Sequence, residues 1–172
     1  SQDGEYIAIG SNDEHVYLFG KESNSVLWTY DAVYHVVDVG LSADGSHLAF
    51  CTGSHFYLLE VSTEEFLIDL DIGCDNEDSL AISMDGNYIA VGYNNRLHFL
   101  SSSFNMSIWY TDYESGSSDA VSISADGNYI AFGRSNPASV SLYSRSSNVP
   151  IWVHNIGGDV DVSEIAISSD GN

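Results

Sequence analysis

Aspartate recurs at one place in a repeated phrase, and a ring of carboxylates is an arrangement that binds calcium, which prefers oxygen ligands. In this chain the repeated aspartate stands in the motif S-x-D-G. That motif is also typical of a tight turn, in which Asp accepts amide hydrogen bonds and Gly adopts a positive φ. One such residue occurs in each repeat, so we interpret them as turn formers rather than as ligands of one metal. They are Asp3, Asp44, Asp85, Asp126 and Asp170.

Histidine is the other residue type with a chemical role to consider. The six histidines are scattered over different repeats, whereas ligands of one metal must meet at one point. The chain contains no G-x-S-x-G, no H-E-x-x-H and no phosphate-binding glycine loop. We therefore predict surface or packing roles for the histidines. We assign no catalytic, cofactor-binding or metal-binding residue, and we do not expect an enzyme.

The two cysteines stand at related places in the repeat. Cys51 replaces a glycine that the other repeats carry as Gly10, Gly92 and Gly133, and Cys74 lies in the segment that follows at the same end. A disulfide between them is one interpretation, and two buried free thiols are the simpler one. The sequence leaves both open.

The elements that position these residues follow from the repeat itself. The phrase begins at Ser1, Ser42, Ser83, Ser124 and Ser168, at steps of 41, 41, 41 and 44 residues. This period is typical of a β-propeller. We divide 1–172 into repeats at 1–41, 42–82, 83–123 and 124–167, with 168–172 as the start of another. Because the last five residues resemble the first five, we expect an excerpt of a longer tandem array.

Each repeat reads as four short strands bounded by turns, as at 6–9, 16–19, 26–28 and 36–39. One such sheet has two apolar faces that only neighbouring sheets can cover. We predict an all-β propeller with four-stranded antiparallel blades, about four of them in this chain. They would form a closed four-bladed ring, or part or half of a ring of seven or eight. The recurring Trp28, Trp109 and Trp152 would pack between blades on the outermost strand.

Acidic residues gather in the segments that lead into the innermost strands. In a propeller these segments share one face around the mouth of the channel. An acidic ring there would hold a cation such as Ca²⁺ or grip a basic peptide, and ordinary solvation is the favoured alternative. The candidate residues of this face are Asp38, Asp75, Glu77, Asp78, Asp119, Asp159 and Asp161.

The order S-x-D-G-x-Y-I-A-x-G, then V-Y-L-F, then L-W-x-Y resembles the quinoprotein-like and WD-repeat-like propeller repeats of archaeal and bacterial surface proteins. The resemblance covers the whole chain and implies the propeller fold. The Gly-His and Trp-Asp dipeptides of WD repeats are absent, as are the vicinal cysteines and metal-ligand cluster of a quinone-dependent dehydrogenase.

Charge and composition narrow the class of partner. The formal net charge of −21 would repel phosphate backbones, so we exclude nucleic acid as a partner. No apolar run is long enough to span a membrane. Asn105 begins an N-glycosylation triplet. We expect a non-catalytic scaffold that binds protein or glycan, or assembles with itself, at a cell surface or outside the cell. A cofactor-binding or catalytic propeller is the alternative function, and the cytoplasm is the alternative location.

Overall fold

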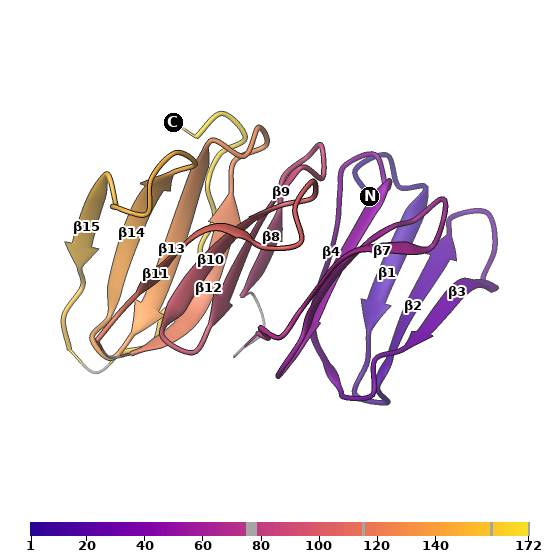
Figure 1. Ribbon diagram of the computed structural model, residues 1–172, viewed down its shortest axis with the longest axis horizontal. Helices are drawn as coiled ribbons and strands as arrows, with labels where there is room; N and C mark the ends of the chain where they lie inside the picture. Colours follow the sequence, from indigo (N-terminus) through magenta and orange to yellow (C-terminus); the bar gives the residue numbers. More distant parts are fainter. Residues whose placement is uncertain (75–78, 115, 159, 172) are drawn as a thin grey trace.

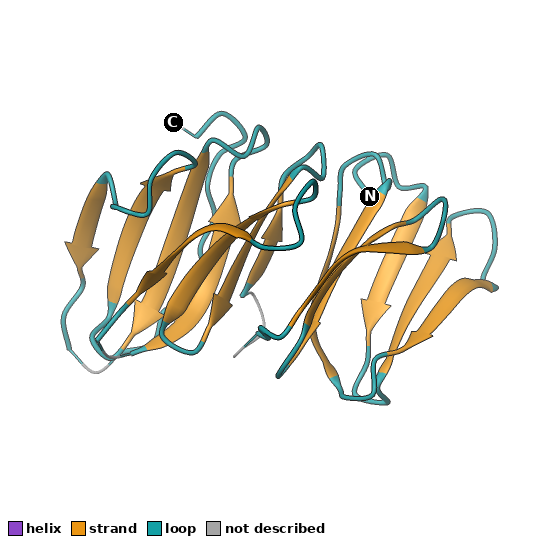
Figure 2. Cartoon of the chain, in the orientation of Figure 1, coloured by secondary structure: helices purple, strands orange, loops and turns teal. Residues whose placement is uncertain are grey.

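In the computed structural model, which describes residues 1–74, 79–114, 116–158 and 160–171, the chain is all-β (Figure 1). These residues form four antiparallel sheets and no helix, so no membrane-crossing helix occurs among them (Figure 2). The strands of the first two sheets are β1 (Tyr6–Gly10), β2 (His15–Gly20) and β3 (Val26–Asp31), then β4 (Val36–Leu41), β5 (His47–Thr52), β6 (Phe56–Glu60) and β7 (Glu65–Leu70). Those of the last two are β8 (Leu80–Ile82), β9 (Tyr88–Tyr93), β10 (Arg96–Ser101) and β11 (Ser107–Asp112), then β12 (Ser117–Ile123), β13 (Tyr129–Ser135), β14 (Ser139–Ser144) and β15 (Trp152–Asn155).

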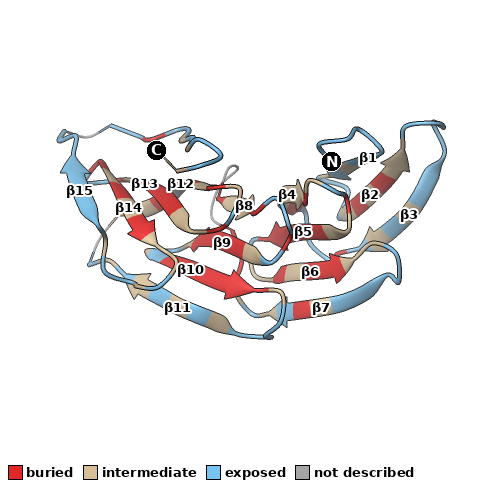
Figure 3. Ribbon diagram, turned by 90° about the horizontal axis from the view of Figure 1, so that it is seen from above, coloured by how far each residue is buried: buried red, intermediate tan, exposed pale blue. Residues whose placement is uncertain are grey.

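Each sheet is a meander in which consecutive strands pair, as short polar turns between β-branched and aromatic runs predict. The four sheets follow one another along an arc (Figure 3). The strands β4, β8 and β12 contact one another in turn along its inner side. The outermost strands β3, β7, β11 and β15 lie on the other side, and the two chain ends face the open side of the arc (Figure 3).

The apolar core lies between successive sheets. Leu48 and Phe50 of the second sheet pack against Val16 of the first, and Ile89 of the third packs with Leu58 of the second. Phe132 of the fourth packs with residues of the third in the same way. Neighbouring sheets therefore cover one another's faces, which is the packing that the repeat predicts.

Main-chain hydrogen bonds join the S-x-D-G turns of successive repeats. The N–H of Gln2 donates to the oxygen of Ala43 at 2.8 Å, and that of Ala43 donates to Met84 at 2.9 Å. Met84 donates to Ala125 at 3.0 Å, and Ala125 donates to Ser169 at 2.9 Å. We call this series the turn ladder. It ties the inner ends of all four sheets together.

The repeated aspartates hold these turns, as we predicted. In the turn at Ser124, Asp126 accepts a hydrogen bond from the Ser124 hydroxyl at 2.8 Å and from the Asn128 N–H at 2.9 Å. Such bonds stabilise the carboxylate and lower the pKa of Asp126. The same bonds from the N–H and hydroxyl of Ser46 and the hydroxyl of Ser42 lower the pKa of Asp44 to about 2.

The structure differs from the sequence interpretation at the end of the chain. Ile165–Ile167, which we expected to form an innermost strand, lies in no strand. The opening sheet has three strands, so this segment does not close a four-bladed ring with it. The physical reason is distance along the arc, because the two ends of the chain face its open side instead of meeting (Figure 3).

Candidate functional site

The array of sheets has two ends with different chemistry. The S-x-D-G turns gather at one, which we call the turn end. The segments that join each sheet to the next gather at the other, which we call the connection end (Figure 1). The turns repeat almost unchanged, whereas the connections 32–35, 71–79 and 113–116 differ in length and sequence. Variation on a constant frame is typical of a surface that carries specificity.

The acidic face predicted at the connection end is described only in part. Asp75, Glu77, Asp78 and Asp159 lie outside the described residues, as does the side chain of Asp119, whose backbone belongs to β12. Asp161 is exposed. Within the described part of the chain, no three His, Cys, Asp or Glu side chains gather as metal ligands would.

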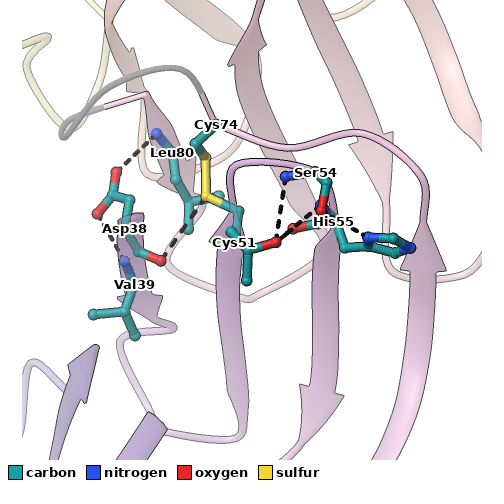
Figure 4. The surroundings of a disulfide bond; sticks show 8 residues. Asp38, Val39, Cys51, Ser54, His55, Cys74 and Leu80 are labelled. Carbon is teal, nitrogen blue, oxygen red and sulfur yellow. Dashed lines mark hydrogen bonds between the residues drawn. A yellow bond between two sulfur atoms is a disulfide. The ribbon is translucent and has the colours of Figure 1, made fainter. Parts of the chain in front are cut away.

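Asp38 lies at the seam between the second and third sheets, and its carboxylate is used there. One oxygen accepts the N–H of Val39 at 2.7 Å and the other accepts the N–H of Leu80 at 3.0 Å (Figure 4). Leu80 begins the innermost strand of the third sheet, so Asp38 links β4 to β8. Asp38, a candidate residue of the acidic face, therefore has a structural role in joining two sheets.

A disulfide joins Cys51 and Cys74 beside Asp38 (Figure 4). The two Cα atoms are 5.8 Å apart, within the usual range for a disulfide. Both cysteines are buried, and the N–H of Cys74 donates to the oxygen of Thr52 at 2.9 Å. Of the two interpretations that the sequence left open, the structure has the disulfide. It fixes Cys74, in the segment that follows β7, against the end of β5.

The repeat explains why a cysteine fits at this place. A side chain at Gly10 would overlap Val36, the first residue of β4, and one at Gly133 would overlap Val162, which follows β15. At the equivalent place in the second sheet the space holds the sulfur bridge from Cys51. The equivalent space is thus filled by a valine side chain beside Gly10 and Gly133, and by the disulfide at Cys51.

His98 is buried on β10, where the sequence gave no sign that it differs from the other histidines. Its Nδ1 lies 3.0 Å from the Ser107 hydroxyl, and its Nε2 has no hydrogen-bond partner. Burial, aided by the charge of Arg96 and opposed by that of Asp112, lowers the pKa of His98 to about 4. The folded protein therefore holds a neutral imidazole here.

We expect this histidine to make the protein sensitive to mild acid. The unfolded chain takes up a proton near pH 6.5 and the folded chain only near pH 4, so the free energy of unfolding falls as the pH falls through this range. At pH 5 the loss from His98 is on the order of 2 kcal/mol. Urea unfolding at pH 7.5 and pH 5 measures it. His98→Met should reduce the loss, and His154→Met, at an exposed site, should not.

An open hollow of about 750 Å³ lies at the turn end. Its walls are the inner strands and their turns. The lining includes Val39 and Leu41 of β4, Ile82 of β8 and Met84 of the next turn, together with Ile7 of β1. The sequence analysis did not find this hollow. The available signal was the apolar residue just before each S-x-D-G motif, such as Leu41 and Ile82.

The remaining residues singled out in the sequence are three tryptophans and Asn105. Trp28 and Trp109 pack in the cores between sheets, and the indole of Trp109 donates to the backbone oxygen of Arg145 at 2.8 Å. Trp152 on β15 remains 47% exposed. Asn105 lies in an exposed loop, and its side-chain oxygen accepts the N–H of Asp69 at 3.2 Å.

A scan against models of known protein families found no match to this chain, and a search of curated proteins found none either.

Proposed function

We propose that the chain is a segment of a β-propeller, of the quinoprotein-like and WD-repeat-like kind, that serves as a non-catalytic scaffold for binding protein. The observation that carries this proposal is the contrast between the constant turn end and the varied connection end. Sheets stacked along an arc and covering one another's faces support the radial arrangement. The binding face on this proposal is the connection end.

The partner that fits this face is a basic protein segment. The chain carries 25 acidic residues against 4 Lys and Arg. The exposed Asp31 lies beside the connection 32–35 and the exposed Glu114 lies in the connection 113–116, whereas the exposed Asp161 lies in the segment that follows β15. A field of this sign attracts cationic partners and repels anionic ones, including acidic glycans. The buried disulfide favours an extracellular or cell-surface location, because disulfides persist in oxidising compartments.

Binding of an octalysine peptide distinguishes a binding face at the connection end from attraction by the overall negative charge of the chain. We expect it to bind the full chain at low ionic strength, and the triple variant Asp31→Asn, Glu114→Gln, Asp161→Asn to weaken binding about fivefold, as the loss of three exposed ion contacts predicts. The matched control replaces three exposed acids of the turn end, Glu22, Glu64 and Glu65, by Gln. It removes the same charge and should have little effect. Equal weakening by both variants, measured by titration calorimetry, would refute a binding face at the connection end.

The alternative, a cofactor-binding or catalytic propeller, predicts a different result. Calcium together with a quinone tricarboxylate would then raise the melting temperature of the chain by several degrees, as a ligand of the folded state must. On our proposal the melting temperature does not change, because Lys21, Arg96, Arg134 and Arg145 are the only fixed cationic side chains available to such an anion.

A further inference from the structure

Asn105-Met106-Ser107 has the N-x-S pattern of an N-glycosylation acceptor, and neither the fold nor the proposed binding face accounts for it. No second triplet of this kind occurs in the sequence. Asn105 lies in the turn 102–106 between β10 and β11 and is exposed. Its neighbours Phe104 and Met106 are 61% and 63% exposed. The triplet therefore stands on the surface, where an attached oligosaccharide has room.

The carboxamide of Asn105 is oriented by the neighbouring sheet. Its Oδ1 accepts the N–H of Asp69 in β7 at 3.2 Å. A backbone N–H can only donate, so the oxygen must face β7 and the nitrogen lies on the other branch of the carboxamide. Within the described part of the chain, this Nδ2 has no hydrogen-bond partner. An N-linked sugar is attached through Nδ2 and leaves Oδ1 able to accept, so the fold and the modification use different atoms.

Asn148 is the equivalent residue of the fourth sheet, because each of the two asparagines stands four residues before the tryptophan of its outer strand. Its carboxamide has the opposite orientation. Nδ2 of Asn148 donates to the backbone oxygen of Tyr110 in β11 at 3.2 Å, and a carbonyl can only accept, so here the nitrogen faces the protein. The residue two positions later is Pro150, which has no hydroxyl, so Asn148 begins no acceptor triplet. Of the two asparagines, the one in the triplet is the one whose nitrogen is turned away from the neighbouring strand.

The turn that carries Asn105 also differs from the others in its surface. A chain of net charge −21 keeps its surface solvated largely through charge, yet the turn 102–106 contains no charged residue and exposes Phe104 and Met106. The equivalent turns of the other sheets all carry charge, at Lys21 and Glu22, at Glu64, and at Arg145. An oligosaccharide is strongly hydrated without help from protein charge, and its C–H groups pack on aromatic rings. A sugar on Asn105 would therefore cover the two apolar side chains.

We propose that Asn105 carries an N-linked oligosaccharide. In the transfer, Nδ2 of Asn105 forms a bond to the anomeric carbon of an oligosaccharide that is esterified to a polyprenyl phosphate or diphosphate. The bond from that carbon to the phosphate oxygen breaks, the lipid phosphate leaves with the electron pair, and Nδ2 releases one proton to solvent. The inference rests on the proposed extracellular or cell-surface location, because this modification belongs to secreted proteins.

Mass spectrometry of the tryptic peptide 97–134 tests the modification directly. In the protein from its own source, we expect this peptide to carry a sugar mass on Asn105. The chain secreted from eukaryotic cells with an added signal sequence should carry one too. In those cells Asn105→Gln and Ser107→Ala should each lose the whole mass increment, and Ser107→Thr should keep it because threonine restores the hydroxyl. A peptide without sugar from either source would overturn the proposal.

Moving the triplet to Asn148 tests whether the orientation of the carboxamide matters. Pro150→Ser, combined with Asn105→Gln, leaves Asn148 as the acceptor. A sugar on its nitrogen would crowd β11 and break the bond to Tyr110. We expect this sugar-bearing form to melt about 3 °C below the same variant made with the transfer inhibited, as the loss of one hydrogen bond predicts. In the parent chain, the sugar at Asn105 should leave the melting temperature unchanged or raise it. An equal decrease at both sites would overturn the proposal.

The experiment on the binding face does not depend on this one. Octalysine binding is measured on the sugar-free chain and changes acidic residues only, so its failure would leave the sugar on Asn105 in place. An unmodified Asn105 in the protein from its own source would leave octalysine binding as expected. Either proposal can therefore fail without the other.

Discussion

Replacing Cys51 and Cys74 together by alanine is expected to lower the free energy of unfolding by about 3 kcal/mol. The bond closes a loop between residues 23 apart in sequence, so its loss returns conformational freedom to the unfolded chain. It also removes the covalent link between Cys74 and the end of β5, which leaves the backbone hydrogen bond to Thr52 and the packing of this position in the core between the sheets. Urea unfolding of the two proteins measures the difference.

Unfolding measured with a reductant present is the control for this experiment. Unfolding of the parent chain under reducing conditions should shift toward the double alanine variant, and the variant itself should not respond. Single variants at Cys51 or Cys74 should match the double variant, because either one removes the bond. A loss below about 1 kcal/mol would mean that the sheets hold this connection without the disulfide.

Gly127→Ala is expected to destabilise the fold by about 3 kcal/mol, through two separable effects. Gly127 has φ +68°, where an L-residue is strained by about 1–2 kcal/mol. Its added Cβ would also lie 2.5 Å from the ring of Tyr88 in the preceding repeat, near the base of the ring, which cannot rotate away. The second effect is steric overlap of the kind that costs about 1–3 kcal/mol in a packed interior.

Gly4 supplies the matched control. It occupies the same place in the first S-x-D-G turn with φ +73°, and a Cβ there would meet nothing within 4 Å. Gly4→Ala should therefore show the backbone strain alone. The difference between the two variants in urea unfolding measures the packing of one turn against the preceding repeat. Equal losses would show that this packing contributes nothing.

The repeat predicted the all-β class, the four sheets and the turn role of the aspartates, because these depend on local pattern. Asp126 and its neighbours make their bonds within five residues of one another. Packing between sheets was predictable for the same reason, since every repeat leaves equivalent apolar faces.

What the sequence did not settle depends on how repeats meet in space. The disulfide needed the distance between Cys51 and Cys74, which their spacing along the chain does not give. The burial of His98 follows from its neighbours Ser107 and Tyr110 across the β10–β11 pair. Whether Ile165–Ile167 reaches the opening sheet depends on the curvature of the whole array, which no single repeat encodes.

The turn ladder has a consequence for how such a protein changes over evolutionary time. Its bonds use main-chain atoms alone, at positions occupied here by Gln2, Ala43, Met84, Ala125 and Ser169. Four of these residues also line the hollow. Substitutions at these positions can therefore change the polarity and size of the side chains that line the hollow without removing the main-chain hydrogen bonds of the turn ladder. The surface of the hollow can thus diverge in evolution faster than the fold.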